Sequence, residues 1–434
     1  MKGCFGKLFL SGYLLVADPD GYYNRVNRNR KPQTVFCREE NRMAITLNPY
    51  HSLAAAALVL VLGRFIISKL KFLKRICIPA PVVGGLIFAL VHLGLYQAGV
   101  CEITVDGTFK DLFMNLFFTS VGFGASFQIL KKGGVQVVLF LLIAMILCVL
   151  QNLAGCGIAS LMGLDARIGL ACGSIPMLGG HGTSAAFGPV LENAGVNSAS
   201  TVAVAAATFG LVAGSITGGP CAAFLIRRHD LKSESAAVSV KKEEKVGKVD
   251  PVRFVNAGLC YAVALGVGMV ISSLIARTGI TLPSYLGCML VAALIRNLND
   301  LFHKEMVLPE INAIAELSLA LFLAIAMMTL KLWQLKNLAL PMILMLIAMV
   351  LLTVTVALFV VYPLMGKDYD AAVMSAGLCG FGMGATPNAV ANMQACTEKH
   401  GPAQRAFFVV PIVGGLFVDF VNSAVITAFL NFLK

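Results

Sequence analysis

The chain has 434 residues, of which 58% are hydrophobic and 13% are charged, whereas about 25% of the residues in an ordinary soluble domain are charged. Its mean hydropathy of +0.82 excludes a water-soluble enzyme, because no soluble core of this size buries so much apolar surface. The net charge of +12 indicates either a nucleic-acid partner or the charge asymmetry of a membrane protein.

Residues 1–42 differ from the rest of the chain. They contain eight basic and four acidic residues, with an apolar run at 8–17. That run is too short to span a membrane, which takes about 20 residues of helix. It fits a degenerate signal peptide with Ala17 near the cleavage point. Alternatively, Met43 is the true start, after an upstream reading error or a disordered extension. We favour Met43 and treat 1–42 as a separate extension.

From residue 50 onward, long apolar runs alternate with short charged loops, and we expect ten membrane-spanning helices. The expected spans are 51–69, 76–98, 110–130, 135–162, 199–226, 252–276, 280–298, 310–331, 337–364 and 405–432. The hydrophilic segment 227–253 is typical of a solvated linker. It separates a first five-helix repeat at 43–226 from a second one at 254–434.

The two halves resemble each other at an offset of about 204 residues, which slips by one or two residues further along. The matches are Pro79 with Pro283, Phe118 with Phe322, LIAM at 142–145 with LIAM at 346–349, Asp165 with Asp368, and 180–184 with 382–386. Several matches near one register indicate an internal duplication.

Positive charges in the loops predict the topology. With the linker placed in the cytoplasm, alternating loops give 19 Lys and Arg residues on the cytoplasmic side and 6 outside. Five spans per half is an odd number, so the second half enters the membrane inverted, as in many secondary transporters. The basic charge therefore reflects topology, and no sequence pattern supports nucleic-acid binding.

Two apolar stretches, 166–190 and 369–395, are too rich in Gly, Pro, Ser and Thr for simple lipid-facing helices. Each follows the fourth span of its half, which predicts two re-entrant hairpins that line a cavity. We expect half-helices to begin and be capped at Thr183 or Ser184 and at Thr386 or Asn388. Free N–H groups there attract a carboxylate. The alternative is a pair of packing hairpins without a ligand.

Asp419 is the one acidic residue well inside an expected span, and such residues are usually functional. Asn422, Gln151 and Asn152 add neutral oxygens suited to a sodium ion. The alternative role for all four is hydrogen bonding between helices. His181 is suited to bind substrate, to titrate or to cap its hairpin.

Two other kinds of chemistry have little support. An intramembrane hydrolase using His181 and Ser184 is disfavoured, because the chain has no GxSxG elbow, no HExxH motif and no paired intramembrane aspartates. The twelve cysteines form no CxxC pair, and most lie in or beside apolar segments, as small buried side chains do.

At the hairpins the sequence resembles the bacterial sodium/glutamate symporter family. The resemblance covers about residues 51–430. Its motifs are IPAPVVGG (78–85), GGHGTSAAFGP (179–189), AATFGLVAGS (206–215), LKLW (330–333), GKDYDAAV (366–373), CGFGMGATPNAVANMQA (379–395) and VVPIVGG (409–415). The basic N-terminal extension has no counterpart in the family pattern.

The resemblance implies sodium-driven uptake of L-glutamate across the cytoplasmic (inner) membrane. It also implies an all-α fold of two inverted five-span domains with one re-entrant loop each, and a homodimer that moves its cargo by an elevator-like displacement. Sodium is the co-transported ion, and no organic cofactor is implied. The positions carried over are Gly179, Gly180, His181, Gly182 and Thr183 in the first loop and Gly380, Gly382, Gly384, Thr386 and Pro387 in the second. Ser184 stands where some members have Gly or Ala. A proton-coupled carrier, or a carrier of another small organic anion, is the rival reading.

Overall fold

The computed structural model describes residues 43–70, 78–132, 134–233, 250–278, 283–303 and 306–433, and the backbone of four short strands before them. It divides into two compact units. The smaller unit comprises Met1–Ile45 and Gly94–Glu102, and the larger comprises Thr46–Leu93 and Ile103–Lys434. The linker prediction falls largely on 234–249, which lie outside the described residues.

The smaller unit contains an antiparallel sheet with strand order β1-β2-β3-β4. Its strands are β1 (Lys7–Leu10), β2 (Tyr13–Ala17), β3 (Tyr23–Val26) and β4 (Gln33–Thr34). The apolar run at 8–17 therefore forms two short strands rather than a helix, which agrees with its being too short to span. Two further strands, β5 (Met43–Leu47) and β6 (Cys101–Val105), form a second sheet.

Helices occupy all ten expected spans of the larger unit. They are α1 (Pro49–Lys69), α3 (Ala80–Gln97), α4 (Thr108–Gly124), α6 (Gly134–Leu161), α9 (Ala199–His229), α10 (Pro251–Ala276), α11 (Ser284–Leu301), α12 (Leu308–Met328), the run Ala339–Leu364 and the run Gln404–Phe432. By length and composition, eight of these described helices are able to cross a membrane. The other two are α4, with 17 residues, and α11, which carries charged Arg296 and Asp300.

The last two spans contain π-helical turns. One consists of α13 (Ala339–Val356), η3 (Ala357–Val361) and α14 (Tyr362–Leu364). The other consists of α17 (Gln404–Ile412), η4 (Val413–Phe417) and α18 (Val418–Phe432). Such turns disrupt the regular backbone hydrogen bonding of a helix and occur frequently at functional sites.

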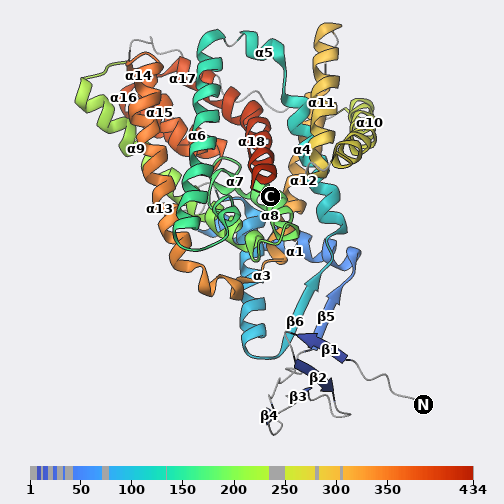
Figure 1. The fold of residues 1–434 in the computed structure, drawn as a ribbon. Coiled ribbons are helices and arrows are strands. Elements are labelled where there is room, and N and C mark those ends of the chain that lie inside the picture. Colours follow the sequence, from blue (N-terminus) through green and yellow to red (C-terminus); the bar gives the residue numbers. More distant parts are fainter. Residues whose placement is uncertain are drawn as a thin grey trace. The chain divides into compact units, whose positions relative to one another are not determined.

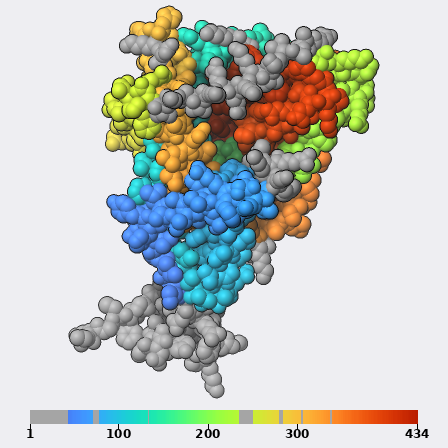
Figure 2. Space-filling model, turned by 180° about the vertical axis from the view of Figure 1, so that it is seen from behind, coloured from blue at the N-terminus to red at the C-terminus, as the bar shows by residue number. Residues whose placement is uncertain are grey.

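One group of helices is centred on α4, which packs against α11 and α12, while α10 packs against α11 (Figure 1). Glycines allow the close approach of α4 and α11, because a Cβ on Gly122 would lie 2.2 Å from the Met289 carbonyl oxygen. Polar bonds add to this contact. Asn297 Nδ2 donates to Ala125 O (2.8 Å), and Ser126 Oγ donates to Asp300 Oδ2 (2.5 Å). On the reverse face, the blue surface of α1 and α3 borders the orange surface of α12 (Figure 2).

A second group, α6, α9, α13, α17 and α18, surrounds the two Gly-rich stretches. Its core contains fully buried large side chains such as Phe140, Leu147 and Phe381. The rings of Phe140 and Phe381 pack edge to face at 5.8 Å, which joins α6 to the second stretch. The Gly-rich segments therefore lie inside the helical core rather than at the lipid-facing surface.

Candidate functional site

The first Gly-rich stretch folds as a broken hairpin. It comprises η1 (Ala166–Gly169), α7 (Ser174–Met177) and α8 (Gly180–Asn193), and its tip lies between α7 and α8. Asp165 caps its start by accepting a hydrogen bond from the Arg167 N–H (2.9 Å). The Arg167 side chain also bonds this carboxylate and lowers the pKa of Asp165.

The second stretch folds as two packed helices, α15 (Tyr369–Phe381) and α16 (Thr386–His400). A Cβ on Gly380 would lie 2.4 Å from Ala389 Cα, so the two arms are in backbone contact. Asp368 caps the start of α15 through the Ala371 N–H (2.9 Å) and is paired with Arg405. The two aspartates that the repeat aligns, Asp165 and Asp368, thus play equivalent roles.

The second half-helix begins at Thr386, as expected, but the expected side-chain caps are wrong. α8 begins after Gly179 and α16 after Ala385, and neither helix has a side-chain cap. Ser184 Oγ instead donates to Ala203 O (3.1 Å), and Asn388 Nδ2 donates to Leu211 O (2.9 Å). Both side chains therefore bond α9 rather than the starts of their own helices, and Asn388 Oδ1 is buried without a partner among the described residues.

The two hairpin tips meet through their backbones. Gly180 has a φ of +58°, a value that favours glycine, and a Cβ there would lie 2.6 Å from Gly384 O. The contact requires a residue without a side chain at Gly180. It confirms the inference that glycines allow the hairpins to approach each other closely.

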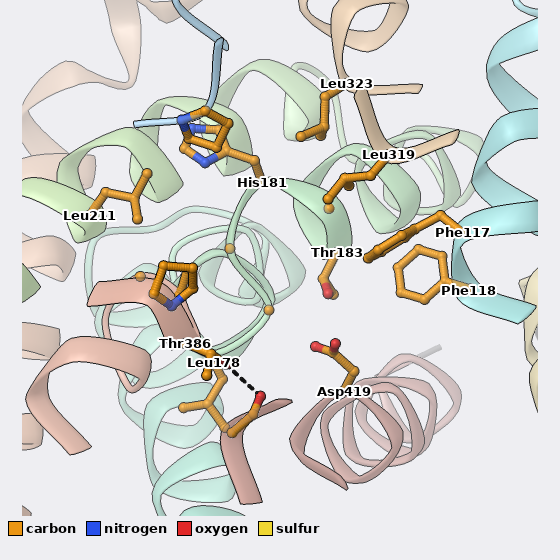
Figure 3. A pocket seen from close by; sticks show the side chains of 18 residues that line it. Phe117, Phe118, Leu178, His181, Thr183, Leu211, Leu319, Leu323, Thr386 and Asp419 are labelled. Carbon is orange, nitrogen blue, oxygen red and sulfur yellow. Dashed lines mark hydrogen bonds between the residues drawn. The ribbon is translucent and has the colours of Figure 1, made fainter. Parts of the chain in front are cut away.

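A cavity of about 220 Å³ lies at this meeting point. Nine of the predicted site residues line it: Gly179, Gly180, His181, Gly182, Thr183, Gly384, Thr386, Pro387 and Asp419. The Asp419 carboxylate faces Thr183 across the cavity, with the rings of Phe117 and Phe118 to one side (Figure 3). The predicted residues Ser184, Gly380, Gly382 and Asn388 are not part of this lining.

The π-helical turn η4 connects Asp419 to the second hairpin. Thr386 Oγ1 donates a 2.7 Å hydrogen bond to the Gly414 carbonyl, the dashed line in Figure 3. In a regular helix this carbonyl accepts a hydrogen bond from the residue four positions on. The π-turn disturbs that pattern. Asp419 follows two residues after η4, in the first turn of α18.

The other three residues predicted to bind sodium form hydrogen bonds to the backbones of the hairpins. Asn152 Oδ1 accepts a hydrogen bond from Ser174 N (2.9 Å), and Asn422 Nδ2 donates one to Ser174 O (3.1 Å). Both side chains therefore bond the backbone of the same residue in the first hairpin. Gln151 Nε2 donates to Gly382 O (2.9 Å) in the second hairpin. These three side chains are fully buried and lie outside the lining that contains Asp419.

His181 bonds to α9 rather than to its own hairpin backbone. Its Nε2 lies 3.0 Å from Thr208 Oγ1, and that hydroxyl donates its one hydrogen to Val204 O. Thr208 therefore accepts from His181, which places the proton on Nε2. Ser184 and His181 bond different partners and do not bond each other, so they do not form a nucleophile–base pair.

The apolar wall of the cavity could not be predicted from polar motifs. Phe117, Phe118, Leu319 and Leu323 come from α4 and α12. The one available signal was the repeat itself, which aligns Phe118 with Phe322, a residue that is fully buried on α12. Apolar residues in apolar helices give no signal of which ones face a cavity.

Two interrupted hairpins that meet at a partly polar cavity, within a chain of many membrane-spanning helices, define a secondary transporter rather than an enzyme. Residues 45–402 match the sodium/glutamate symporter family. The chain belongs to this family.

The relatives match over nearly their whole length. The sodium/glutamate symporter of Escherichia coli K12 is 40% identical over 88% of this chain and 98% of its own. That of Haemophilus influenzae is 37% identical over 88% and 97%. A sodium–proton antiporter from Methanocaldococcus jannaschii is 12% identical over 88% of this chain and 98% of its own, with a TM-score of 0.40, a level that does not establish a shared fold.

Proposed function

We propose that this protein is a sodium-coupled symporter that takes up L-glutamate across the cytoplasmic membrane. The observation that carries the proposal is the cavity between the hairpin tips, with Asp419 on its wall. Its volume of about 220 Å³ suits a solute smaller than the drug-sized ligands that occupy pockets of about 300–1,000 Å³. The relatives are named sodium/glutamate symporters, and their name is the reason that we propose glutamate as the solute and sodium as the coupled ion.

The first hairpin supplies the anion site in this proposal. The first N–H groups of α8, at Gly180, His181 and Gly182, have no partners within the helix and lie at its positive end. α16 offers fewer donors, because Pro387 has no N–H and Asn388 N bonds Ala385 O. A substrate carboxylate therefore binds at the start of α8.

Asp419 supplies the cation site and the coupling. Its carboxylate and an anionic substrate share one cavity, and two like charges about 6 Å apart repel by roughly 3 kcal/mol at an effective dielectric near 20. Sodium bound at Asp419 removes this repulsion, so each ligand favours binding of the other. The roles of Gln151, Asn152 and Asn422 in sodium binding stay predictions. Gln151 Oε1 is a buried oxygen without a partner among the described residues.

Uptake of radiolabelled glutamate into proteoliposomes tests the proposal. We expect an imposed inward sodium gradient to drive accumulation, and a pH gradient without sodium to drive none. Competition by aspartate and by small dicarboxylates measures how strictly glutamate is selected. Uptake that ignores sodium contradicts the coupling, and uptake driven by the pH gradient favours the proton-coupled rival.

We also propose that the two five-helix halves are inverted repeats with the linker in the cytoplasm. The matched caps at Asp165 and Asp368 support the duplication. The orientation is supported by the loop charges, with 19 Lys and Arg residues on the expected cytoplasmic side and 6 on the outer side. The homodimer and the elevator-like displacement rest on the family resemblance, and cross-linking in the membrane tests the dimer.

A further inference from the structure

Tyr285 of α11 lies next to the apolar wall of the cavity and has no part in the proposed function so far. Its side chain is fully buried. Its ring stacks on the ring of Phe118, with the ring centroids 3.9 Å apart and an angle of 17° between the planes. Phe118 lines the cavity, whereas Tyr285 does not. Tyr285 therefore supports this part of the wall from outside the lining.

The same ring contacts the first hairpin. The ring of Phe187, on α8, meets the ring of Tyr285 edge to face, with centroids 6.0 Å apart and planes at 89°. Stacked and edge-to-face arrangements are the favoured geometries of aromatic pairs. The start of α8 is the proposed anion site. The ring of Tyr285 thus joins the cavity wall on α4 to the helix that is proposed to bind the substrate carboxylate.

The hydroxyl of Tyr285 reaches the helix that carries Asp419. Its Oη lies 3.5 Å from Ser423 Oγ, a long hydrogen bond in which either oxygen can be the donor. Ser423 follows Asp419 by four residues on α18, so the two side chains lie on the same face of that helix. Tyr285 and Ser423 are both fully buried, and water therefore cannot take the place of this bond.

Tyr285 connects the two groups of helices. It belongs to the group centred on α4, whereas α18 belongs to the group that surrounds the hairpins. One side chain thus contacts the wall on α4, the first hairpin and the helix of Asp419. Phe118 and Asp419 both face the cavity (Figure 3). In a close-packed interior, a shift of α18 against the wall must disturb this buried ring or its hydroxyl.

We propose that Tyr285 is a positioning residue that holds Asp419 in place relative to the wall against which the substrate binds. The inference rests on the proposed function, in which sodium binds at Asp419. The two parts of the side chain act separately. The hydroxyl orients α18 and hence the cation site, and the ring supports Phe118 and hence the substrate wall. Neighbours that orient a ligand-binding group tune its affinity without touching the ligand.

Tyr285→Phe tests the hydroxyl, because it keeps the ring and its aromatic contacts. We expect the sodium concentration for half-maximal glutamate uptake to rise about threefold, with an unchanged KM for glutamate at saturating sodium. Ser423→Ala should have the same effect. The double variant should also show a rise of about threefold rather than about ninefold, since both changes remove the same bond.

Tyr285→Leu tests the ring. It removes the surface on which Phe118 stacks, so the KM for glutamate at saturating sodium should rise about fivefold in addition to the change in the sodium curve. A wild-type KM in this variant overturns the support of the wall. If Tyr285→Leu fails to reach the membrane, Tyr285→Phe and Ser423→Ala still decide the proposal.

Tyr261→Phe is the matched control. Tyr261 is a buried tyrosine of α10, in the same helix group, and its hydroxyl donates to Ile311 O (3.1 Å) outside the cavity lining. We expect its sodium and glutamate curves to match those of the wild type. A sodium shift that Tyr261→Phe reproduces overturns the proposal, because the shift then follows from the loss of any buried hydroxyl.

The sodium curves decide the remaining outcomes. A wild-type curve in Tyr285→Phe, additive effects of Tyr285→Phe and Ser423→Ala, or a loss confined to Vmax overturns the role of Tyr285. Each of these outcomes leaves sodium-driven uptake by the wild type intact. Absence of that uptake contradicts the proposed function itself.

A second readout is the dependence on Asp419. When Tyr285→Phe is added to Asp419→Asn, we expect no further change in the sodium curve, because the hydroxyl acts through the carboxylate that is already lost. A further rise of about threefold in the double variant overturns the proposal, since it shows that Tyr285 acts independently of Asp419.

Discussion

Gly180 and Gly384 hold the tips of the two hairpins in backbone contact, since a Cβ on Gly180 would lie 2.6 Å from the Gly384 carbonyl oxygen. The two residues belong to segments that the repeat aligns, 180–184 in the first half and 382–386 in the second. The cavity is built around this contact, with hairpin residues from both halves in its lining. The proposed substrate site therefore depends on both hairpins at once.

Gly180→Ala is expected to abolish most transport. The substitution adds a clash with Gly384 O to the strain of a positive φ, which costs about 1–3 kcal/mol for a residue with a side chain. Glutamate uptake at matched membrane levels measures the loss. Gly219→Ala is the control, because its Cβ meets no atom within 4 Å. Wild-type uptake by Gly180→Ala would show that the contact is dispensable.

Asp419→Asn is expected to weaken the dependence of uptake on sodium while the protein still inserts and folds. The amide keeps the shape of the side chain but removes the charge that we propose holds the cation, and interactions with charged groups contribute about 1.5–3 kcal/mol. The sodium concentration for half-maximal uptake should rise at least about tenfold. A sodium activation curve like that of the wild type would assign Asp419 a structural role instead.

A second readout of Asp419 is the coupling between the ligands. Because the carboxylate no longer repels the substrate, we expect Asp419→Asn to bind glutamate with little help from sodium. Equilibrium binding of radiolabelled glutamate with and without sodium measures this. Asp111→Asn, at an exposed carboxylate of α4, is the control. A variant that binds glutamate only with sodium, as the wild type is expected to, contradicts the electrostatic account of coupling.

Asn152 and Asn422 are expected to act as one unit, because they bond the N–H and the C=O of the same residue, Ser174. Asn152→Ala leaves the buried Ser174 N–H without this partner, at a cost of about 1–3 kcal/mol. Asn422→Ala removes one of three hydrogen bonds to Ser174 O, which also accepts from Leu178 N and Gly179 N, and should cost about 0.5–1.5 kcal/mol. The double variant should lose less than the sum of the two, since the freed backbone can shift.

Thermal unfolding of the purified variants measures this non-additivity. A reference double variant combines Asn152→Ala with an alanine substitution of Asn193, an exposed residue that does not bond Ser174. This double variant should shift the midpoint additively. Additive losses for Asn152 and Asn422 would show that the two bonds stabilise the hairpin independently.

The spans and the hairpins could be predicted from the sequence, because both follow from local composition. Ten apolar runs gave ten helices, and the glycines at 179–182 and 382–384 mark both breaks. The glycines also predicted the close approach of the tips, and a carboxylate inside an apolar span marked Asp419 as a site residue. No local pattern predicted that Asp419 lies at the meeting of the tips.

The roles of individual polar side chains could not be predicted, because they depend on which helix packs opposite. Ser184 and Asn388 have the composition of caps, but they face α9 and bond its carbonyls. The π-helical turn before Asp419 contains Gly414, whose carbonyl accepts a hydrogen bond from Thr386, and no local pattern distinguishes this turn from a regular helix at Gly414–Gly415. Packing between distant segments decides both cases.

His181 gives the last prediction, because its bond to Thr208 has a defined direction. The ring donates from Nε2, and the side-chain amide of glutamine can place a donor near the same point. His181→Gln should therefore retain much of the uptake, whereas His181→Leu leaves the Thr208 hydroxyl without its donor and should lose several-fold. Uptake by the two variants at matched levels is compared across pH 6–8. Equal losses in both would mean that the imidazole itself contacts the substrate, and a pH dependence that disappears in both would mean that it titrates during transport.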